Sequence, residues 1–284
     1  TWTVKDSGGT ANGGVDTLNQ SLAITVAAVN DAPVASGSAL LATVNENTAN
    51  PTGSTVSTLF STPFSDAADS VSGGSTANTL LGVAITANAA NSSEGIWQWQ
   101  ASGSSSWIDL PNTGLSDSTA LFIASSTKLR FLPATNYSGD PGVLTIRLVD
   151  SSTSLANNTY IDVVTNGATS AFSANTVALS TTVRAINDPP VQTGTPPNPI
   201  SVLEDANNTS AVSLGMGGLA YGPGGGVDEL SQTLTYTLTA IPAFISVFKA
   251  DGTTAVTANT TLTLSELQGL KYKTIANANG SGSL

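Results

Sequence analysis

Apolar residues recur at every second position in many short stretches of the chain. Examples are Leu22, Ile24 and Val26; Leu81, Val83 and Ile85; Leu129 and Phe131; Leu144, Ile146 and Leu148; and Leu234, Tyr236 and Leu238. Ser, Thr or Ala fill most intervening positions, and Gly, Asn, Asp and Pro clusters separate the stretches. Such strands bury one face and expose the other, as in antiparallel sheets. The pattern predicts an all-β fold of tandem antiparallel β-sandwiches, with one helical turn at residues 265–270 capped by Ser265.

Four patterns occur twice along the chain, in the same order if residue 284 is taken to continue into residue 1. An Asn-Asp-x-Pro stretch at residues 30–33 returns at residues 187–190, an offset of 157 residues. Each is followed by a strand with an acid, at Glu46 and at Glu204. The other two pairs are an aromatic strand with Asn and Gly (129–139 and 270–280) and a strand ending in Asp (147–152 and 3–8). Such spacing is typical of repeated structural units.

The repeats predict three parts. Residues 1–29 would be the C-terminal strands of a preceding β-sandwich repeat, residues 30–186 a complete sandwich, and residues 187–284 the N-terminal part of a following repeat. Residues 280–284 joined to residues 1–6 would reproduce the strand entry at residues 139–150. This continuity suggests that the chain is one period of a longer array, in which residues 1–29 of the next copy complete residues 187–284.

Composition narrows the chemistry. The chain has 19 acidic and 8 basic residues, a net charge of −11 and a pI near 4.1. This balance disfavours nucleic-acid partners and docking on anionic membranes, and favours divalent cations. The absence of Cys and His excludes thiol nucleophiles, Ser–His triads, disulfides and nearly all zinc sites. No apolar run reaches the roughly 18 residues of a membrane span, and no secretion signal is visible.

Oxygen-bearing side chains gather at the predicted junctions and loops, where they could hold calcium. Calcium takes roughly six to eight oxygen ligands from carboxylates, amides and carbonyls. The candidates of the first junction and middle part are Asn30, Asp31, Glu46, Asp66, Asp69 and Asp150. The candidates of the second junction are Asn187, Asp188, Glu204, Asp205, Asp228 and Glu229. The alternative is that each Asn-Asp-x-Pro is an ion-free turn, in which the Asn and Asp side chains bond their own backbone.

The junction motif, the downstream Glu46 and Glu204, and the aromatic Asn-Gly stretches together resemble bacterial cadherin-like tandem repeats. Such repeats occur in large secreted surface adhesins of the RTX and VCBS type. The resemblance covers essentially the whole chain and implies calcium-stiffened β-sandwiches outside the cell. The linker departs from animal cadherins, because it lacks their first Asp and the Asn that follows Asp31 or Asp188.

Other candidate chemistry is weaker. Trp97 and Trp99 lie two residues apart in a hairpin with Trp107, which indicates cross-strand packing or, alternatively, a sugar-binding face. Asp66 and Asp69 lack any sign of the cleft that a glycosidase needs. The glycines at 222–226 lack the Lys-Ser/Thr of a phosphate loop. Neither Thr-rich strands as an ice-binding surface nor a Lys-Asn isopeptide bond is specifically indicated.

The sequence therefore predicts a non-enzymatic extender segment of a calcium-stiffened adhesin or fibre on the extracellular cell surface. Its partners would be neighbouring repeats, and other domains would bind the cell-surface or glycan target. The alternatives are a filament subunit with strand exchange between copies and a carbohydrate-binding module.

Overall fold

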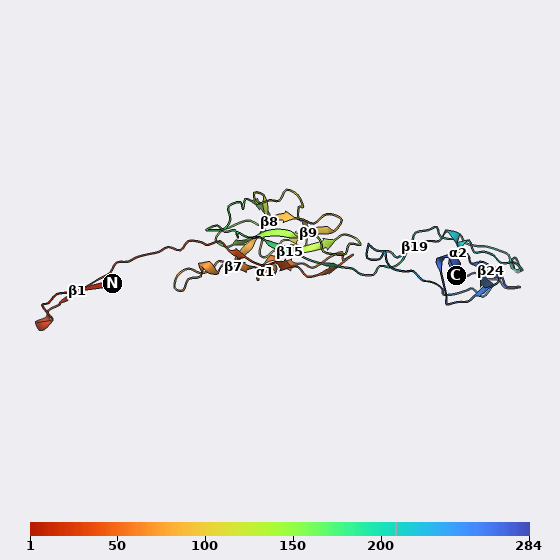
Figure 1. The fold of residues 1–284 in the computed structure, drawn as a ribbon. Helices are drawn as coiled ribbons and strands as arrows, with labels where there is room; N and C mark the ends of the chain where they lie inside the picture. Colours follow the sequence, from red (N-terminus) through yellow and green to blue (C-terminus); the bar gives the residue numbers. More distant parts are fainter. Residues whose placement is uncertain (208) are drawn as a thin grey trace.

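The computed structural model describes residues 1–207 and 209–284. These residues form many short β-strands, mostly in antiparallel sheets, together with two short α-helices and three 3-10 turns. The predicted all-β character is confirmed. Figure 1 shows an elongated chain whose parts we call the N-terminal segment (residues 1–29), the middle unit (residues 30–186) and the C-terminal unit (residues 187–284).

The N-terminal segment contains one hairpin, at the far end of the chain in Figure 1. Strand β1 (Trp2–Lys5) pairs antiparallel with β2 (Thr17–Gln20), and the turn η1 (Ala11–Gly13) lies between them. The Lys5 ammonium contacts the Asp16 carboxylate at 3.1 Å. No hydrophobic side chain of this segment is buried among the described residues, so the hairpin has no core of its own.

The rest of this segment is extended and exposed. Residues 21–33 form no strand, although the alternation of Leu22, Ile24 and Val26 predicts one. These three side chains are 71, 80 and 89% exposed. The prediction fails here because no neighbouring strand satisfies the backbone groups of the stretch.

The larger sheet of the middle unit has the strand order β14-β11-β8-β13-β15-β4. Its strands are β4 (Ala39–Leu40), β8 (Leu80–Asn88), β11 (Ala120–Ala124), β13 (Leu144–Asp150), β14 (Thr159–Ile161) and β15 (Val177–Ser180). All neighbours are antiparallel except β15 and β4, which run parallel. This pair departs from the antiparallel arrangement predicted, because β4, near the start of the unit, and β15, near its end, both run from its first junction towards its second.

The smaller sheet has the order β10-β9-β12-β6. Its strands are β6 (Ser54–Thr55), β9 (Gly95–Gln100), β10 (Ile108–Asp109) and β12 (Lys128–Pro133). Two further strand pairs flank the sheets: β3 (Val34–Ala35) with β7 (Phe64–Ser65), and the parallel pair β5 (Val44–Asn45) with β16 (Val183–Arg184). The helix α1 (Val56–Leu59) and the turn η2 (Ala67–Asp69) complete the connections.

Both sheets of the middle unit contribute to one hydrophobic core. Trp97 and Phe131 of the smaller sheet are fully buried, as are Ile85 and Ile146 of the larger sheet. The Trp97 and Phe131 rings meet edge to face, with centroids 5.2 Å apart. The Trp97 indole N–H donates to the Gly142 carbonyl at 2.8 Å, which satisfies its only polar group. Burying each such side chain contributes about 1.5–3 kcal/mol, so this core dominates the stability of the unit.

The C-terminal unit repeats part of this plan. Its four-stranded sheet has the order β18-β24-β21-β22, and β20 pairs with β23 and β17 with β19. The strands are β17 (Val191–Gln192), β18 (Val212–Ser213), β19 (Tyr221–Gly222), β20 (Tyr236–Leu238), β21 (Ile245–Phe248), β22 (Ala255–Val256), β23 (Thr260–Leu262) and β24 (Lys271–Thr274). Val247, Leu270 and Tyr272 lie at the centre of a smaller core. The turn η3 (Met216–Gly218) lies beside the helix α2 (Leu264–Gln268).

The helix α2 occupies the predicted position, but its cap differs from the prediction. Thr263, not Ser265, is the N-cap: its hydroxyl accepts the Glu266 N–H, and the Glu266 carboxylate accepts the Thr263 N–H at 2.9 Å. Ser and Thr can both cap a helix, so the choice depends on Glu266, which stands three residues after Thr263 and closes the capping box.

The two units correspond strand by strand in the smaller sheet and differ in the larger one. The order β10-β9-β12-β6 has its counterpart in β22-β21-β24-β18, and β3–β7 has its counterpart in β17–β19. The pair β20–β23 takes the place of β8–β11. Among the described residues of the C-terminal unit, no strand stands where β13, β15 and β4 lie in the middle unit.

Candidate metal centres at the unit junctions

The first junction is fixed by hydrogen bonds that join Asn30 and Asp31, which we call the linker, to the rest of the middle unit. The Asp31 N–H donates to Asp69 Oδ1 at 2.9 Å. The Asn30 amide donates to the carbonyls of Asp31 and Ser170 at 3.1 and 3.2 Å. The Asn78 amide donates to Asn30 Oδ1 at 2.8 Å and to Asp69 Oδ2 at 3.1 Å. The Asn-Asp pair is therefore held against the loop that follows β7.

Three carboxylates lie behind this linker. Asp66 precedes η2, Asp69 ends it and Asp150 ends β13, and their exposed fractions are 5, 6 and 0%. Asp66 Oδ2 accepts the Asn78 N–H at 2.5 Å, and Asp150 Oδ1 accepts the Ser152 N–H at 2.8 Å.

The remaining oxygens of this cluster are unsatisfied. Asp66 Oδ1 and Asp150 Oδ2 are buried and have no hydrogen-bond partner. Burial, together with the negative charges of Asp69 and Asp150, raises the pKa of Asp66. Buried carboxylate oxygens without a partner are costly, and a bound cation would satisfy them and remove the repulsion.

The second junction repeats the scheme of the first. The Asp188 N–H donates to Glu229 Oε1 at 3.1 Å, as the Asp31 N–H does to Asp69. The Gln232 amide donates to Asn187 Oδ1 at 3.0 Å, as the Asn78 amide does to Asn30. The Asn187 amide again donates to the carbonyl of the following Asp, at 3.1 Å. Glu229 thus takes the role of Asp69, and Gln232 takes the role of Asn78.

The end of the middle unit contributes to this second junction. Glu46 is 3% exposed, and its Oε1 accepts the Ile186 N–H at 2.6 Å. The Asn47 amide donates to Asp188 Oδ2 at 3.1 Å, and Asn47 Oδ1 accepts the Asn136 N–H at 2.9 Å. Asn47 therefore links the two units across the junction.

Unsatisfied oxygens are found here as well. Glu46 Oε2, Asp228 Oδ1 and Glu229 Oε2 are buried without a hydrogen-bond partner. Around them the backbone packs too closely for side chains. A Cβ at Gly225 would lie 2.9 Å from Asp188 Oδ2, and one at Gly226 would collide with the Asn136 carbonyl oxygen. Oxygens of Asp188, Asp228 and Asn136 thus lie close to these two glycines, from both sides of the junction.

A third acidic pair lies at the far end of the C-terminal unit. Asp205 Oδ1 accepts the Asn277 N–H at 2.8 Å, and Glu204 Oε2 accepts the Asn279 amide at 3.0 Å. The first bond has its counterpart between Asn47 and Asn136 in the middle unit. All four residues of these two bonds have a left-handed backbone, with φ of 59, 59, 63 and 58° at Asn47, Asn136, Asp205 and Asn277. This correspondence agrees with the repeat seen in the sequence.

The structure distributes the predicted ligands between the two ends of each unit. Glu46 is not with Asp66, Asp69 and Asp150, but at the second junction. Glu204 and Asp205 are not with Asp188, because each unit places its Asn-Asp at one end and its Glu strand at the opposite end. Glu229 proves as central as Asp228, since it holds the Asp188 N–H and keeps a free oxygen. The signal for Glu229 was its place in the loop that corresponds to Asp69.

The residues present fit a hard cation, although they are not closed around one. Asn30, Asp31, Asp66, Asp69 and Asp150 supply oxygens at the first junction, and Glu46, Asn187, Asp188, Asp228 and Glu229 at the second. Within the described chain, no three Asp or Glu side chains converge closely enough to form a ready-made metal site. Binding calcium would therefore draw the carboxylates together, as its flexible coordination permits.

Two side chains of the Trp hairpin pack in the core of the middle unit. Trp97 and Trp99 are 0 and 4% exposed, which confirms the packing interpretation and removes the aromatic row on which sugar binding depended. The Trp107 ring instead covers the Arg130 guanidinium, whose carbon lies 4.0 Å from the ring centroid. Arg130 also donates to Gln98 Oε1 at 2.8 Å, so this hairpin is internally satisfied.

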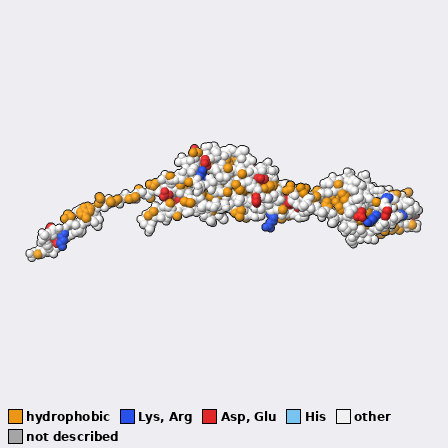
Figure 2. All heavy atoms as spheres, viewed as in Figure 1, with side chains coloured by type: hydrophobic (Ala, Val, Ile, Leu, Met, Phe, Trp, Pro, Cys, Tyr) orange, Lys and Arg blue, Asp and Glu red, His pale blue; other side chains and the backbone are white. Residues whose placement is uncertain are grey.

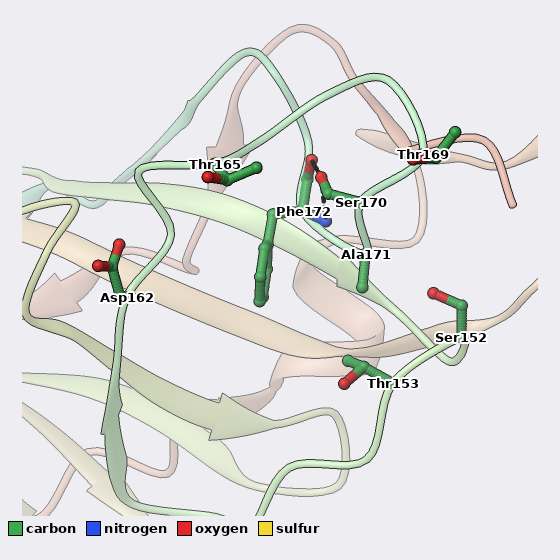
Figure 3. Close-up of a pocket in the computed structure, with 8 residues that line it drawn as sticks. All are labelled: Ser152, Thr153, Asp162, Thr165, Thr169, Ser170, Ala171 and Phe172. Atoms are coloured by element: carbon green, nitrogen blue, oxygen red, sulfur yellow. Dashed lines mark hydrogen bonds between the residues drawn. The ribbon is translucent and has the colours of Figure 1, made fainter.

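A hollow beside the first junction differs from both acidic clusters (Figure 3). It is open, with a volume of about 440 Å³, and hydroxyl groups and Phe172 line most of it. Its one carboxylate, Asp162, accepts the Val164 N–H at 2.8 Å, and the Ser170 hydroxyl donates to the Phe172 carbonyl at 3.1 Å. These polar groups serve local turns.

Across residues 1–207 and 209–284, the structure contains no helix that is both long enough and apolar enough to cross a membrane. Searches against family models, curated proteins and solved structures found no match to this chain.

Proposed function

We propose that this chain is a structural extender of an extracellular surface fibre or adhesin, built from cadherin-like β-sandwich units that calcium stiffens at their junctions. The observation that supports it most is the repeated junction, with one hydrogen-bond scheme and partnerless buried carboxylate oxygens at each copy. Figure 2 shows acidic side chains near both ends of the middle unit, where such ions would bind.

The form of the molecule supports a spacer role. The units follow one another along an extended chain (Figure 1), so each contacts only its neighbours. Calcium between two units would join a linker to loops on both sides and restrict the angle between them. We infer a mechanical rather than a catalytic role for these residues.

The affinity expected of such modules suits a location outside the cell. Extracellular calcium modules bind with dissociation constants of roughly 10⁻⁴–10⁻³ M. A hundredfold excess of calcium over such a constant would stabilise the folded state by about 2.7 kcal/mol per site. The fibre would be pliable at low calcium and stiff in a calcium-rich medium.

The test is thermal unfolding and small-angle scattering of the full chain, with calcium and then with a chelator. We expect calcium to raise the melting temperature and to increase the maximum dimension. Glu229→Gln should weaken both effects, because the amide still accepts the Asp188 N–H but loses the charge. Asp162→Asn, which changes a carboxylate outside both clusters, should leave them unchanged. Identical curves with calcium and chelator would overturn the proposal.

A further inference from the structure

The C-terminal unit has an open sheet edge and, separately, an unpaired stretch with exposed apolar residues. In the middle unit, β8 lies between β11 and β13, and β15 covers the far side of β13. Its counterpart β20 has β23 on one side and, among the described residues, no strand on the other. The stretch equivalent to β4 and β5 is unpaired as well, and its Ile200, Val202 and Leu203 are 47, 44 and 83% exposed.

The N-terminal segment has the strands that this edge lacks. The strand ending in Asp aligns Trp2 with Ile146 of β13, at an offset of 144 residues, and the Asn-Asp-x-Pro repeat aligns Gln20 with Val177 of β15, at an offset of 157 residues. The hairpin pairs Trp2 with Gln20, and the middle unit pairs Ile146 with Val177. The β1–β2 hairpin therefore has the strand register of the β13–β15 pair, although it lies in isolation.

The side chains match the same positions. Leu22 and Val26 correspond to Leu179 and Val183, which are 0 and 2% exposed in the middle unit. Leu22 and Val26 are themselves 71 and 89% exposed. Figure 2 shows hydrophobic side chains along this extended stretch. Residues that are core in the middle unit thus have exposed counterparts in the N-terminal segment.

We propose that residues 1–29 of a second copy of this chain complete the sheet of the C-terminal unit by strand addition. The second copy is the occupant because its own sequence and register match the missing strands. The middle unit stands between the N-terminal segment and the C-terminal unit of one chain (Figure 1), so a second copy would supply the strands. We call this contact between the C-terminal unit of one copy and residues 1–29 of the second copy the joint. Backbone hydrogen bonds at the open edge and burial of the apolar residues would stabilise it.

The middle unit shows which bonds form at the joint. The Glu46 N–H donates to the Arg184 carbonyl at 2.9 Å, and its carboxylate accepts the Ile186 N–H. In the joint, Glu204 would make these bonds to Ala27 and Val29 of the second copy. Gly139 and Val183 exchange two backbone hydrogen bonds of 2.9 and 2.8 Å, and Gly280 would do so with the second copy's Val26.

The joint also brings Asp205 to Asp31 of the second copy, where the middle unit brings Asn47 to Asp188. Asn47 donates a hydrogen bond, whereas the Asp205 carboxylate accepts only. Two carboxylates would meet, so this joint should depend on calcium more than the internal junction does. This part of the proposal depends on the proposed function, and the strand addition does not.

The test uses cross-linking, because the chain has no native Cys. Chains carrying Val26→Cys are mixed with chains carrying Val202→Cys under mild oxidation in calcium. In the joint Val202 would pair with Val26 of the second copy, as Val44 pairs with Val183 in the middle unit. Residues paired across neighbouring strands lie about 5 Å apart, a distance that a disulfide spans. We expect a covalent dimer. A head-to-tail fusion of two copies, with one Cys in each, tests whether the neighbour is supplied in tandem, and should close the same disulfide.

Matched variants separate this joint from random collision. Val71→Cys replaces Val26→Cys as the control, because Val71 is 58% exposed on the middle unit, away from the proposed joint. No disulfide in either the mixture or the fusion, or equal yields with Val71→Cys, would overturn the proposal. So would a disulfide that closes within one chain carrying both Val26→Cys and Val202→Cys.

Sedimentation of the chain without cysteines gives a second measurement. We expect association that Val26→Asp abolishes and Val71→Asp does not, and a peptide of residues 20–29 should compete with it. Asp205→Asn should make the association at least fivefold less sensitive to chelator. If association persists in Val26→Asp, the strand addition is wrong. If calcium has no effect on either unit while the disulfide still forms, the calcium proposal alone fails.

Discussion

The middle unit and the C-terminal unit have the same strand order in their smaller sheets, yet they bury very different amounts of apolar surface. Among the residues that the structure describes, the main core of the middle unit contains 21 buried hydrophobic residues, and that of the C-terminal unit contains 7. The difference lies in the larger sheet, which has six strands in one unit and two in the other. A repeat pattern alone therefore does not give a core; the neighbouring strands must be present too.

The largest effect on stability is expected from substitutions at equivalent core positions of the two units. Trp97 pairs with Phe131 in the middle unit, as Val247 pairs with Tyr272 in the C-terminal unit. Trp97→Ala should destabilise the middle unit by about 3–5 kcal/mol, because it leaves a large cavity. Calorimetry in dilute solution should show two transitions, of which only the higher one shifts.

Val247→Ala is the matched control for this prediction. It removes two methyl groups, so it should lower only the other transition, by about 1–2 kcal/mol. A single transition that moves equally in both variants would show that the units unfold together, and would contradict the independence of their cores.

The next effect concerns the first junction. Asp66→Asn should remove most of the gain in melting temperature that calcium gives the middle unit, which corresponds to a loss of up to about 2.7 kcal/mol. Without calcium, the variant should be more stable than the natural chain, because it relieves the repulsion among Asp66, Asp69 and Asp150. Titration calorimetry with calcium, together with melting in chelator, measures both effects. Melting in chelator below that of the natural chain would contradict the interpretation.

A smaller effect is expected from opening the second junction. Gly226→Ala should clash with the Asn136 carbonyl and separate the two units, at a cost of about 1–3 kcal/mol. Hydrogen exchange at Asn136 and Asn47 should rise while both cores stay protected. Gly217→Ala is the control, because a Cβ there meets nothing within 4 Å. Unchanged exchange in Gly226→Ala would show that the junction is looser than the structure indicates.

The smallest effect is a pH dependence confined to the C-terminal unit. The hydrogen bond from Lys249 lowers the pKa of Glu266 from 4.5 to about 2. The ionised carboxylate therefore stabilises the folded unit above pH 4.5, and this contribution is lost as the pH falls towards 2. Glu266→Gln should reduce the fall in the melting temperature of the C-terminal unit between pH 4.5 and about 2. Glu94→Gln should not change it. The effect is slight because the pair is exposed.

Much of the strand pattern could be predicted from the sequence. The alternation around Val83, Leu129 and Ile146 lies in β8, β12 and β13, and the Trp hairpin forms β9 and β10. The alternation at Leu22 to Val26 gives no strand, because a β-strand depends on hydrogen bonds to a neighbour and periodicity cannot supply one. The cap of α2 was misplaced by two residues because only Glu266 distinguishes Thr263 from Ser265.

The candidate sites were predictable in composition but not in grouping. Asn-Asp-x-Pro and the loop acids indicated junction chemistry, and the structure brings Asp69 to Asp31 and Glu229 to Asp188. Glu46 follows the first junction closely in sequence, yet it lies at the second. The chain crosses the full length of the unit between Asp31 and Glu46, and spacing along a sequence does not reveal which end of a sheet a strand reaches.

By itself, the sequence determined the β-character, the repeated order of strands and the set of oxygen-bearing residues, because side-chain periodicity and turn chemistry are local properties. Only the tertiary structure decided which strands find partners, which acids share a junction and which apolar row stays exposed. Those outcomes depend on contacts between residues far apart in the chain, where burial and hydrogen bonding require a neighbour to be in place.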